Sequence, residues 1–381
     1  MVNGSAENLG LTWVFTRIQP MDIDIITEPD VSPAQMAELA VEAERYGVRA
    51  LWSSNYHFHY DAFLALAPAA AATSKLNLGV LAVSPWEMHP LKMANAILTL
   101  NEISNGRAMI AVSGGGGLLG AMGWRLSNDA PVWPYQDPVK RVSEPDRRVR
   151  AMRECIEVLE IGRSGEFSMG YDGGVFVIRR PFGMQWAQCG GPLLYTCSSW
   201  PQTIRLGARI ADGIQFSDYT PEMMPEAMKL VRAGLAKREK PADDFRIGNF
   251  WAWHIKKNLE DSMHEARREL IWRGALIGQI EKDIRPFCHD DDELQLILDN
   301  WEDLRIAFRN RSGKIDSIPA NLINRLIAGM ASAGDLGDID REIERYKVFA
   351  DGGLTELSIR LFDDPMDGLK MIGERVVPAF Q

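Results

Sequence analysis

The feature that most constrains the fold of this chain is a repeated alternation of short apolar runs with longer amphipathic segments. The apolar runs have strand character and the segments between them have helical periodicity, which predicts parallel strands joined by helices. The predicted strands cover residues 11–17, 50–54, 76–83, 107–113, 192–197, 213–216, 245–255 and 356–361. Eight such strands close most simply as a (β/α)8 TIM barrel of the α/β class, with its active site at the carboxyl ends of the strands.

The signals that start and end the first helix support this alternation. Ser32 is placed as the N-cap, Pro33 at the first helical position and Gln35 three residues after the cap, which is the pattern of a capping box. Gly47 is placed to end the helix in a left-handed conformation. The first crossover between strands is therefore predicted to be helical from residue 33 to residue 46.

Two stretches interrupt the alternation of strands and helices. Residues 114–145 combine a run of glycines with four prolines, too many for a helix or a central strand. Residues 259–330 are almost entirely helical in pattern, with no strand between the helices. We expect residues 1–381 to form a single barrel domain with these two segments inserted over the carboxyl-terminal rim.

Composition excludes several classes of partner. The chain has 42 Lys and Arg against 52 Asp and Glu, a formal net charge of −10, which argues against nucleic acids and anionic membranes. Neither an apolar run long enough to span a membrane nor a secretory signal is visible in the sequence. The four cysteines lack a CxxC spacing and are expected to be reduced thiols, so we expect a cytoplasmic protein.

A cluster of chemically active side chains follows the second predicted strand, where Asn55 and Tyr56 precede His57, Phe58 and His59. An imidazole near its neutral pKa suits proton transfer, and this position is where barrel enzymes carry their chemistry. The alternative is a loop whose aromatic rings merely cover the barrel mouth. A metal site is not expected, because the fifth and sixth predicted strands end without a further histidine.

Two further strand ends could approach a ligand. Ser113 and Gly114 open a run of glycines after the fourth predicted strand, where the backbone can come close to a planar ligand or a phosphate. Ser198, Ser199 and Trp200 join the fifth predicted strand to its helix, and hydroxyls at a helix N-terminus form an anion site. The alternatives are a flexible rim loop in the first case and a simple N-cap serine in the second.

The ordered set of these segments resembles the luciferase-like flavin- or F420-dependent oxidoreductases. The sequence TLNEISNGR stands before the glycine loop, and ARIADG follows the fifth strand. The resemblance covers nearly the whole barrel, through residues 40–52, 71–90, 98–113, 192–213 and 353–378. It implies a tricyclic redox ring at the barrel mouth, with a bulge in the third strand, often containing a non-prolyl cis peptide, against one face of the ring.

The resemblance assigns residues to the site one by one. The third-strand bulge matches Ala82–Val83, and the phosphate loop matches the serines after the fifth strand. The residues implied to bind the cofactor are Asn55, Ala82, Val83, Ser113, Gly114, Ser198, Ser199 and Trp200. The family usually has an acid-histidine pair where this chain has Asn55 and Tyr56, so the catalytic role stays open among Tyr56, His57 and His59.

Other departures bear on the choice of cofactor. Bacterial luciferases have an arginine on the flavin phosphate where this chain has Gly114, and the F420 sugar-phosphate dehydrogenases have a catalytic glutamate near Gly116 that is absent here. Ser199-Trp200 also replaces a glycine pair common in the F420 enzymes.

The function expected from this resemblance is a two-component monooxygenase. It would use reduced FMN, supplied by a separate flavin reductase, and O2 to oxygenate a small organic substrate. Such chemistry needs a dry, apolar mouth, to which Trp13, Trp86 and Trp124 could contribute. Replacing His57 with Ala is expected to slow turnover by about 10²-fold.

Three alternatives remain beside this expectation. The first is an F420-dependent oxidoreductase that acts by hydride transfer, and the others are a catalytically inert flavin-binding homologue and a metal-dependent barrel hydrolase. In the luciferase-like case we expect a homodimer or a higher homo-oligomer that pairs through the second and third helices, because the family pairs in this way.

Overall fold

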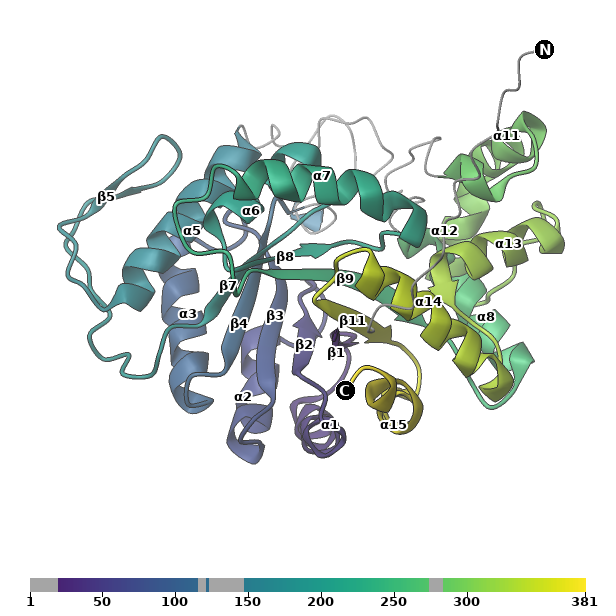
Figure 1. Ribbon diagram of the computed structural model, residues 1–381, viewed down its shortest axis with the longest axis horizontal. Coiled ribbons are helices and arrows are strands. Elements are labelled where there is room, and N and C mark those ends of the chain that lie inside the picture. The colour runs from purple at the N-terminus through teal and green to yellow at the C-terminus, as the bar shows by residue number, and fades with distance from the viewer. Residues whose placement is uncertain (1–19, 116–120, 123–146, 274–283) are drawn as a thin grey trace, which may run out of the picture.

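Eight parallel strands form a closed barrel in the computed structural model, which describes residues 20–115, 121–122, 147–273 and 284–381 (Figure 1). The barrel strands are β1 (Asp22–Thr27), β2 (Ala50–Ser54), β3 (Asn77–Val83), β4 (Ala108–Ser113), β7 (Leu193–Cys197), β8 (Gly213–Phe216), β9 (Arg246–Trp253) and β11 (Glu356–Leu361). Strand β9 pairs with both β8 and β11 and so closes the barrel, and the short β10 (Ala331–Ser332) adds to β9. The predicted (β/α)8 fold is therefore confirmed.

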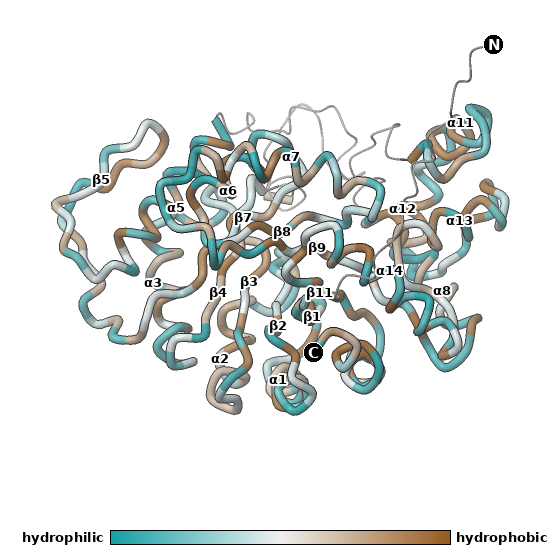
Figure 2. Tube along the Cα trace, in the orientation of Figure 1, coloured by the Kyte–Doolittle hydropathy of each residue, from teal (hydrophilic) through white to brown (hydrophobic). Residues whose placement is uncertain are grey.

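Helices on the outside of the barrel connect its strands. They are α1 (Pro33–Tyr46), α2 (Ala62–Ala72), α3 (Pro90–Ile103), α5 (Arg148–Ser164), α6 (Pro201–Ile210), α7 (Met224–Leu235), α14 (Ile339–Asp351) and α15 (Pro365–Met371). Single turns of other helix types are η2 (Pro221–Met223), η5 (Leu336–Asp338), η6 (Ile372–Val376) and η7 (Val377–Ala379). Figure 2 shows hydrophobic residues concentrated along the strands, while the outer helices alternate between hydrophobic and hydrophilic residues.

The predicted capping of the first helix is confirmed. The Ser32 hydroxyl accepts a hydrogen bond from the Gln35 backbone N–H, and the Gln35 side chain accepts one from the Ser32 backbone N–H. Gly47 ends α1 with φ +78°, a conformation that glycine adopts without steric cost. Local chemistry thus defines both ends of this crossover before any tertiary contact is made.

The first strand was predicted in the wrong place. Residues 11–17 lie outside the described residues, and the position between β11 and β2 is occupied by β1. The sequence of β1, DIDIIT, carries two aspartates and does not look like a buried strand. In the barrel, Asp24 and Ile26 face the interior, whereas Ile23 and Ile25 pack against the helices. The aspartates are tolerated because arginines at the same end of the barrel pair with them.

Side chains from β1, β2, β3, β4, β7 and β9 fill the barrel interior. The central cluster consists of Ile26, Ala50, Trp52, Leu81, Met109, Ala111, Tyr195 and Phe250. The Trp52 indole is fully buried, and Gly79 leaves room for it, since a Cβ at Gly79 would lie 2.0 Å from the indole Cε3. Tight packing of this kind makes the barrel a solid core and confines ligands to its rim.

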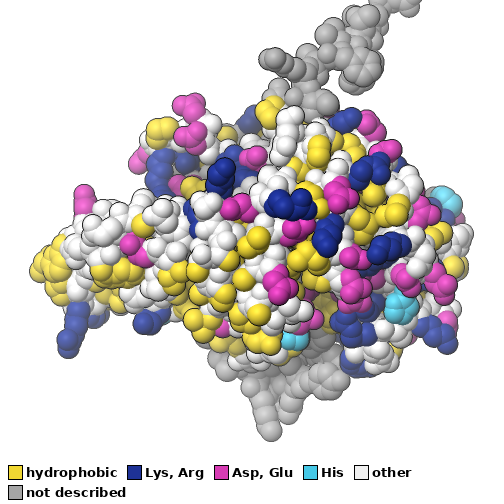
Figure 3. Space-filling model, turned by 90° about the horizontal axis from the view of Figure 1, so that it is seen from below, with side chains coloured by type: hydrophobic (Ala, Val, Ile, Leu, Met, Phe, Trp, Pro, Cys, Tyr) yellow, Lys and Arg dark blue, Asp and Glu magenta, His cyan; other side chains and the backbone are white. Residues whose placement is uncertain are grey.

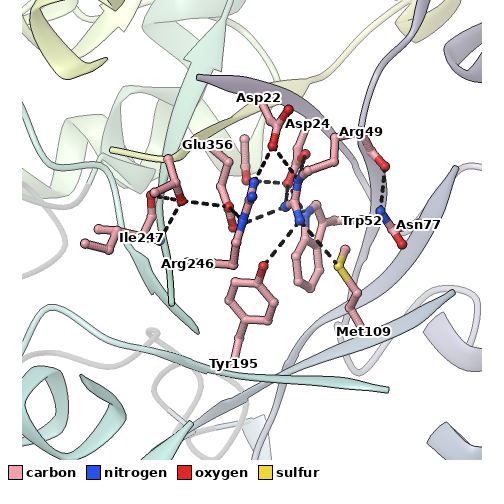
Figure 4. A network of polar contacts seen from close by, with 12 residues as sticks. Asp22, Asp24, Arg49, Trp52, Asn77, Met109, Tyr195, Arg246, Ile247 and Glu356 are labelled. Atoms are coloured by element: carbon pink, nitrogen blue, oxygen red, sulfur yellow. Dashed lines mark hydrogen bonds and ion pairs between the residues drawn. The ribbon is translucent and has the colours of Figure 1, made fainter. Parts of the chain in front are cut away.

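A buried ionic network closes the amino-terminal end of the barrel (Figure 4). Arg49 Nε donates to Asp24 Oδ1 at 2.9 Å, and Arg49 Nη2 lies 3.1 Å from Glu356 Oε1. Arg246 Nε donates to Glu356 Oε2 at 2.6 Å, and the Trp52 indole N–H donates to Asp24 Oδ2 at 2.9 Å. Both carboxylates are fully buried, so each needs its guanidinium partner to remain charged there.

Within the segment 259–330, the described residues 259–273 and 284–330 are largely helical, as the pattern predicts. They contain α8 (Leu259–Glu269), η3 (Leu270–Trp272), η4 (Arg285–Phe287), α11 (Asp291–Asp299), α12 (Trp301–Arg309) and α13 (Ala320–Met330). These helices share a hydrophobic cluster of their own, separate from the barrel core, and lie at one side of the barrel in Figure 1. None of the helices in the described ranges is long and apolar enough to cross a membrane.

The remaining irregular part is a hairpin between α5 and β7. It is formed by β5 (Tyr171–Asp172) and β6 (Val177–Ile178), which pair antiparallel across a turn that contains two glycines, 173 and 174. Most of the other predicted insertion, residues 114–145, lies outside the described residues.

Candidate active site

A cavity of about 750 Å³ opens at the carboxyl ends of the barrel strands. Its lining comes from the residues that follow β1, β2, β3, β4, β8 and β11, together with side chains of α8, η3 and α12. Among the described residues that line it, 10 of 26 carry Asp, Glu, Lys or Arg side chains. The mouth therefore carries many charged side chains beside apolar ones, which differs from the dry, apolar mouth expected from the sequence.

The segment after β2 forms one wall of this cavity. Asn55, Tyr56, His57 and His59 all line it, as their place at a strand end predicts. The Asn55 backbone N–H donates to the carbonyl oxygen of Leu81 at 2.7 Å and so continues the pairing of β2 with β3 beyond the last residue of β2. The sequence-predicted cluster is thus held at the mouth by the sheet itself.

Asn55 joins this wall to a carboxyl group that follows β3. Its side-chain amide donates to Glu87 Oε1 at 2.5 Å and to the carbonyl oxygen of Ala82 at 3.2 Å. The backbone N–H of Ser84 donates to Glu87 Oε2 at 3.2 Å. Burial raises the pKa of Glu87 to about 7, against the opposing effect of these two hydrogen bonds. Glu87 can therefore exchange a proton near neutral pH.

The predicted bulge lies beside this pair. The Leu81–Ala82 peptide bond is cis, and the register of β3 against β4 shifts between Leu81 and Val83. The cis bond thus precedes the Ala82–Val83 pair by one residue. Ala82 lines the cavity, whereas Val83 is fully buried in the core behind it and is not among the residues that line the cavity.

A second carboxyl group with a raised pKa lies at the end of β1. Glu28 Oε1 is 3.6 Å from Arg360 Nε, and burial raises the pKa of Glu28 to about 7 although Arg360 opposes this shift. Burial also raises the pKa of Tyr56 to about 12, so its hydroxyl stays protonated. Glu28, Tyr56 and Arg360 all line the cavity and form its second polar group.

Arginines beside this second group have unused hydrogen-bonding capacity. Arg273 Nη1 donates to Asp218 Oδ1 at 3.0 Å, while its Nε and Nη2 are buried and have no hydrogen-bond partner among the described residues. Arg360 Nε and Arg268 Nη2 are also buried and also have no hydrogen-bond partner among the described residues. Arg273 is not among the residues that line the cavity, whereas Arg268 and Arg360 are. Because buried donors without partners are costly, the side of the cavity formed by Arg268 and Arg360 fits a guest that carries carbonyl or anionic oxygens.

The two histidines lie farther out than the carboxyl groups. His57 and His59 are exposed, and both rings contact the exposed ring of Phe58, with centroids 4.6 and 4.4 Å away. Partial burial and the neighbouring His59 lower the pKa of His57, which favours its neutral form. The catalytic role of His57 and His59 remains a prediction. The Glu87 carboxyl group is more enclosed than either imidazole.

The residues predicted to bind a phosphate lie beside the cavity. Ser198, Ser199 and Trp200 are not among the residues that line it, and Trp200 is exposed. The Ser198 hydroxyl accepts from the Trp200 backbone N–H at 3.0 Å, as in a turn that leads into α6. The Ser199 hydroxyl donates to the carbonyl oxygen of Ser217 at 3.4 Å, and Ser217 does line the cavity. The loop therefore borders the mouth without entering it.

Of the other residues predicted to contact the cofactor or the substrate, some line the cavity and some do not. Ser113 lines the cavity and its hydroxyl accepts from the Gly115 backbone N–H at 3.2 Å, whereas Gly114 is not part of the lining. The Trp86 ring packs 5.7 Å from that of Phe176 in the hairpin and is likewise absent from the lining. Trp13 and Trp124 lie outside the described residues.

Sequence reasoning missed Glu28, Glu87 and Arg360. Glu28 follows the strand that was predicted in the wrong place. Arg360 interrupts the otherwise apolar end of β11, and a charged residue near the carboxyl end of a barrel strand is a signal for a mouth position. Glu87 lies four residues past β3 and has no comparable signal. Within the described residues no group of three or more His, Cys, Asp or Glu could hold a metal ion.

Comparison with known proteins shows what this chain resembles. 5,10-Methylenetetrahydromethanopterin reductase of Archaeoglobus fulgidus is 22% identical over 356 residues, which covers 93% of this chain and 98% of that protein. The solved structure of coenzyme F420-dependent tetrahydromethanopterin reductase from Methanopyrus kandleri matches with a TM-score of 0.71 and 20% identity, over 95% of this chain and 100% of that one.

A flavin-containing structure is also similar. The oxygenating constituent of 3,6-diketocamphane monooxygenase from Pseudomonas putida, in complex with FMN, has a TM-score of 0.59 and 15% identity over 94% of this chain and 98% of that one. At these identities the structural matches show the common fold. The family model described as luciferase-like monooxygenase matches residues 12–356, and the chain therefore belongs to this family of oxidoreductases.

Proposed function

We propose that this protein is an F420-dependent oxidoreductase that transfers a hydride between the deazaflavin and a small organic substrate. The observation that carries the proposal is the polar mouth, which holds two carboxyl groups with a pKa of about 7. Hydride transfer to or from a carbonyl or imine carbon is accompanied by a proton, and such groups can move it at neutral pH. The relatives named above as methanopterin reductases, one of them F420-dependent, support the same choice.

The cavity fits a tricyclic ring of this kind. It has a volume of about 750 Å³, and Ala82, Asn55 and Ser113 together offer a small apolar face with polar groups beside it. The unpartnered guanidinium donors of Arg268 and Arg360 suit the carbonyl oxygens of the ring or of the substrate. Ser198 and Ser199 would hold the phosphate end. When bound there, F420 would supply or accept the hydride.

The residues of this chain then have separate tasks. Glu87 would hold or release the proton through its carboxyl oxygens, and Asn55 would keep that carboxyl in place with its side-chain amide. Glu28 would orient Arg360 and can itself exchange a proton. Tyr56 would offer a neutral hydroxyl to the substrate.

The competing proposal is a monooxygenase that takes reduced FMN from a separate flavin reductase. Its support is the similarity of fold to the Pseudomonas putida enzyme, and the charged lining of the mouth argues against it, because oxygen chemistry on a flavin needs the exclusion of water and protons. The reductase partner, the cytoplasmic location and the homodimer remain predictions from the sequence.

An anaerobic activity assay separates the two proposals. The protein is incubated without O2 with reduced F420 and a panel of ketones, imines and activated alkenes, and the return of the oxidised deazaflavin is followed by its absorbance. Substrate-dependent oxidation of reduced F420 without O2 is expected. A parallel assay in the presence of O2 measures oxygen uptake. Oxygen uptake that requires reduced FMN, with no anaerobic reaction of F420 on any substrate, would contradict the proposal.

A further inference from the structure

His254 and Glu265 form a buried polar pair behind the mouth of the barrel, and the proposed function gives neither of them a task. His254 Nδ1 lies 2.8 Å from Glu265 Oε1, and the two side chains are 1% and 3% exposed. On the face shown in Figure 3, by contrast, Lys and Arg side chains are interspersed with Asp and Glu side chains at the surface, where water solvates them. A buried carboxylate is costly unless it is paired, so the partners of Glu265 indicate its role.

Glu265, on α8, holds the segment that follows β11. Its Oε2 accepts a hydrogen bond from the Asp363 backbone N–H at 3.1 Å and lies 2.8 Å from Lys256 Nζ. Lys256 Nζ also donates to the carbonyl oxygen of Asp363 at 2.7 Å. Glu265 and Lys256 therefore bind the backbone of Asp363 at its N–H and at its carbonyl group, and we call the two side chains the Asp363 clamp. His254, which engages Oε1, keeps the carboxylate turned so that Oε2 faces Asp363.

The clamped segment is part of the cavity wall. Phe362 and Asp363 both line the cavity, and the Phe362 ring stacks on the His254 imidazole with centroids 4.8 Å apart and planes inclined by 24°. The Asp363 carboxylate accepts from Arg268 Nη1 at 2.7 Å and from Arg311 Nη2 at 2.9 Å, and both arginines line the cavity. The position of Asp363 therefore determines where Arg268 presents its Nη2 group, which has no hydrogen-bond partner among the described residues.

This wall lies across the barrel from the residues proposed to face the cofactor. In the closed order of eight strands, β9 lies four places from β3, and β11 lies four places from β4, which is half a turn of the barrel. Ala82 belongs to β3 and Ser113 ends β4, whereas the Asp363 clamp and the segment it holds come from α8 and from the residues after β9 and β11. A ring that rests against Ala82 would therefore leave the substrate between itself and Phe362.

We infer that Glu265 and Lys256 are positioning residues for the substrate. They hold the backbone of Asp363, so that Phe362 and Arg268 form a fixed wall on the substrate side of the cavity. The inference rests on the proposed function, because that function assigns the opposite wall to the cofactor. Glu265 acts here through hydrogen bonds and takes no part in the transfer of the proton.

The kinetic test compares E265A with E265Q, on the compound of the anaerobic panel that oxidises reduced F420 fastest. E265A removes the acceptor for the Asp363 N–H, so we expect KM to rise about tenfold while kcat changes by less than about threefold. The Kd of F420, measured by fluorescence, should stay at the wild-type value. In E265Q the amide oxygen can accept from Asp363 and the amide N–H can donate to His254 Nδ1, so most of the wild-type KM should return.

Three kinetic results would overturn the inference. An unchanged KM in E265A would show that the clamp does not reach the substrate. An equal loss in E265A and E265Q would assign the effect to the charge of Glu265 rather than to its hydrogen bonds. A Kd of F420 that weakens together with KM would place the clamped wall on the cofactor.

A second variant covers the case in which E265A does not fold. The Lys256 side chain is 18% exposed, so K256M removes the other bond to Asp363 at less cost to the core, and it should raise KM about threefold. The matched control is K257M, which breaks the exposed ion pair of Lys257 with Asp367 and should leave KM unchanged. An equal rise in K256M and K257M would also contradict the inference.

Hydrogen exchange tests the Asp363 clamp without substrate or cofactor. The backbone amides of residues 362–364 should exchange at least about tenfold faster in E265A and in K256M than in the wild type and in K257M, because local opening no longer breaks these bonds. If F420 does not bind and no compound of the panel reacts, the proposed function fails, and this measurement then decides the clamp alone. Faster exchange confined to this segment supports the clamp, and unchanged exchange in both variants refutes it.

Discussion

The side-chain amide of Asn55 donates to the Glu87 carboxyl at 2.5 Å, which links the ends of two neighbouring barrel strands inside the cavity. The same amide holds the carbonyl oxygen of Ala82 at 3.2 Å. The acid and the bulged strand are therefore fixed relative to each other by one side chain. This relationship gives Glu87 a defined position, and burial raises its pKa to about 7, so Glu87 has the two properties that a proton-transfer group needs.

Replacing Glu87 with Gln is expected to slow turnover by about 10²- to 10⁴-fold, because the proton carrier is lost while the shape of the side chain is kept. The change in rate near pH 7, which reflects the ionisation of Glu87, should also disappear from the pH–rate profile. Steady-state kinetics across pH 5–9 measure both effects. The matched comparison is H57A: a drop of about 10² in that variant with normal turnover in E87Q would transfer the role to His57.

Replacing Asn55 with Ala is expected to move the pH–rate limb of Glu87 upward. The hydrogen bond from Asn55 favours the charged carboxylate and so lowers its pKa, and removing the donor leaves burial to raise it further. The pH–rate profile of N55A reports the shift directly. A limb that stays in place or moves downward would mean that Asn55 does not control Glu87.

Stability should fall as the pH rises between about 4.5 and 7. Glu28 and Glu87 have the ordinary glutamate pKa of 4.5 when unfolded, but burial raises the pKa of each to about 7 when folded, so above pH 4.5 the folded state binds more protons. Folding is therefore favoured at low pH and loses at most about 3 kcal/mol per group through this window. Urea unfolding at pH 5 and pH 8 measures the loss, which should be smaller in E28Q/E87Q. An equal loss in the double variant would exclude these two groups as its source.

Replacing Arg49 with Met is expected to destabilise the protein by about 3–5 kcal/mol, because Asp24 remains buried without a guanidinium partner, while Glu356 keeps Arg246 alone. The control is R45M, which breaks an exposed ion pair between Arg45 and Glu42 and should cost far less, because exposed ion pairs contribute little to stability. Chemical denaturation of both variants gives the two values. Similar losses in both would show that the buried network contributes no more than a surface pair.

The parts of the fold that depend on local chemistry could be predicted from the sequence. Ser32, Gln35 and Gly47 define the ends of α1 by themselves, and the apolar runs locate seven of the barrel strands. Strand β1 could not be recognised, because Asp24 is buried only by virtue of Arg49, which comes from the loop before the next strand. Its environment is created by the closed barrel and is invisible in the local pattern.

In the candidate site, too, some features could be predicted from the sequence, whereas others depend on the assembled barrel. The segment from Asn55 to His59 was placed at the mouth by its position after a strand. The partners that tune its chemistry, Glu28, Glu87 and Arg360, come from three other strand ends, and their raised pKa values or unsatisfied donors depend on burial that only the assembled barrel provides. The sequence pattern therefore identifies the segment from Asn55 to His59 as a wall of the cavity, whereas only the tertiary structure identifies the carboxyl groups of Glu28 and Glu87.

The central claim is that the mouth of this barrel takes up a deazaflavin. Its most direct test is an anaerobic titration of the purified protein with F420, with FMN and with reduced FMN, followed by fluorescence and absorbance. Saturable binding of F420 in the micromolar range, weakened at least tenfold for both forms of FMN, is the predicted result. Tight binding of reduced FMN with no detectable binding of F420 would contradict the account.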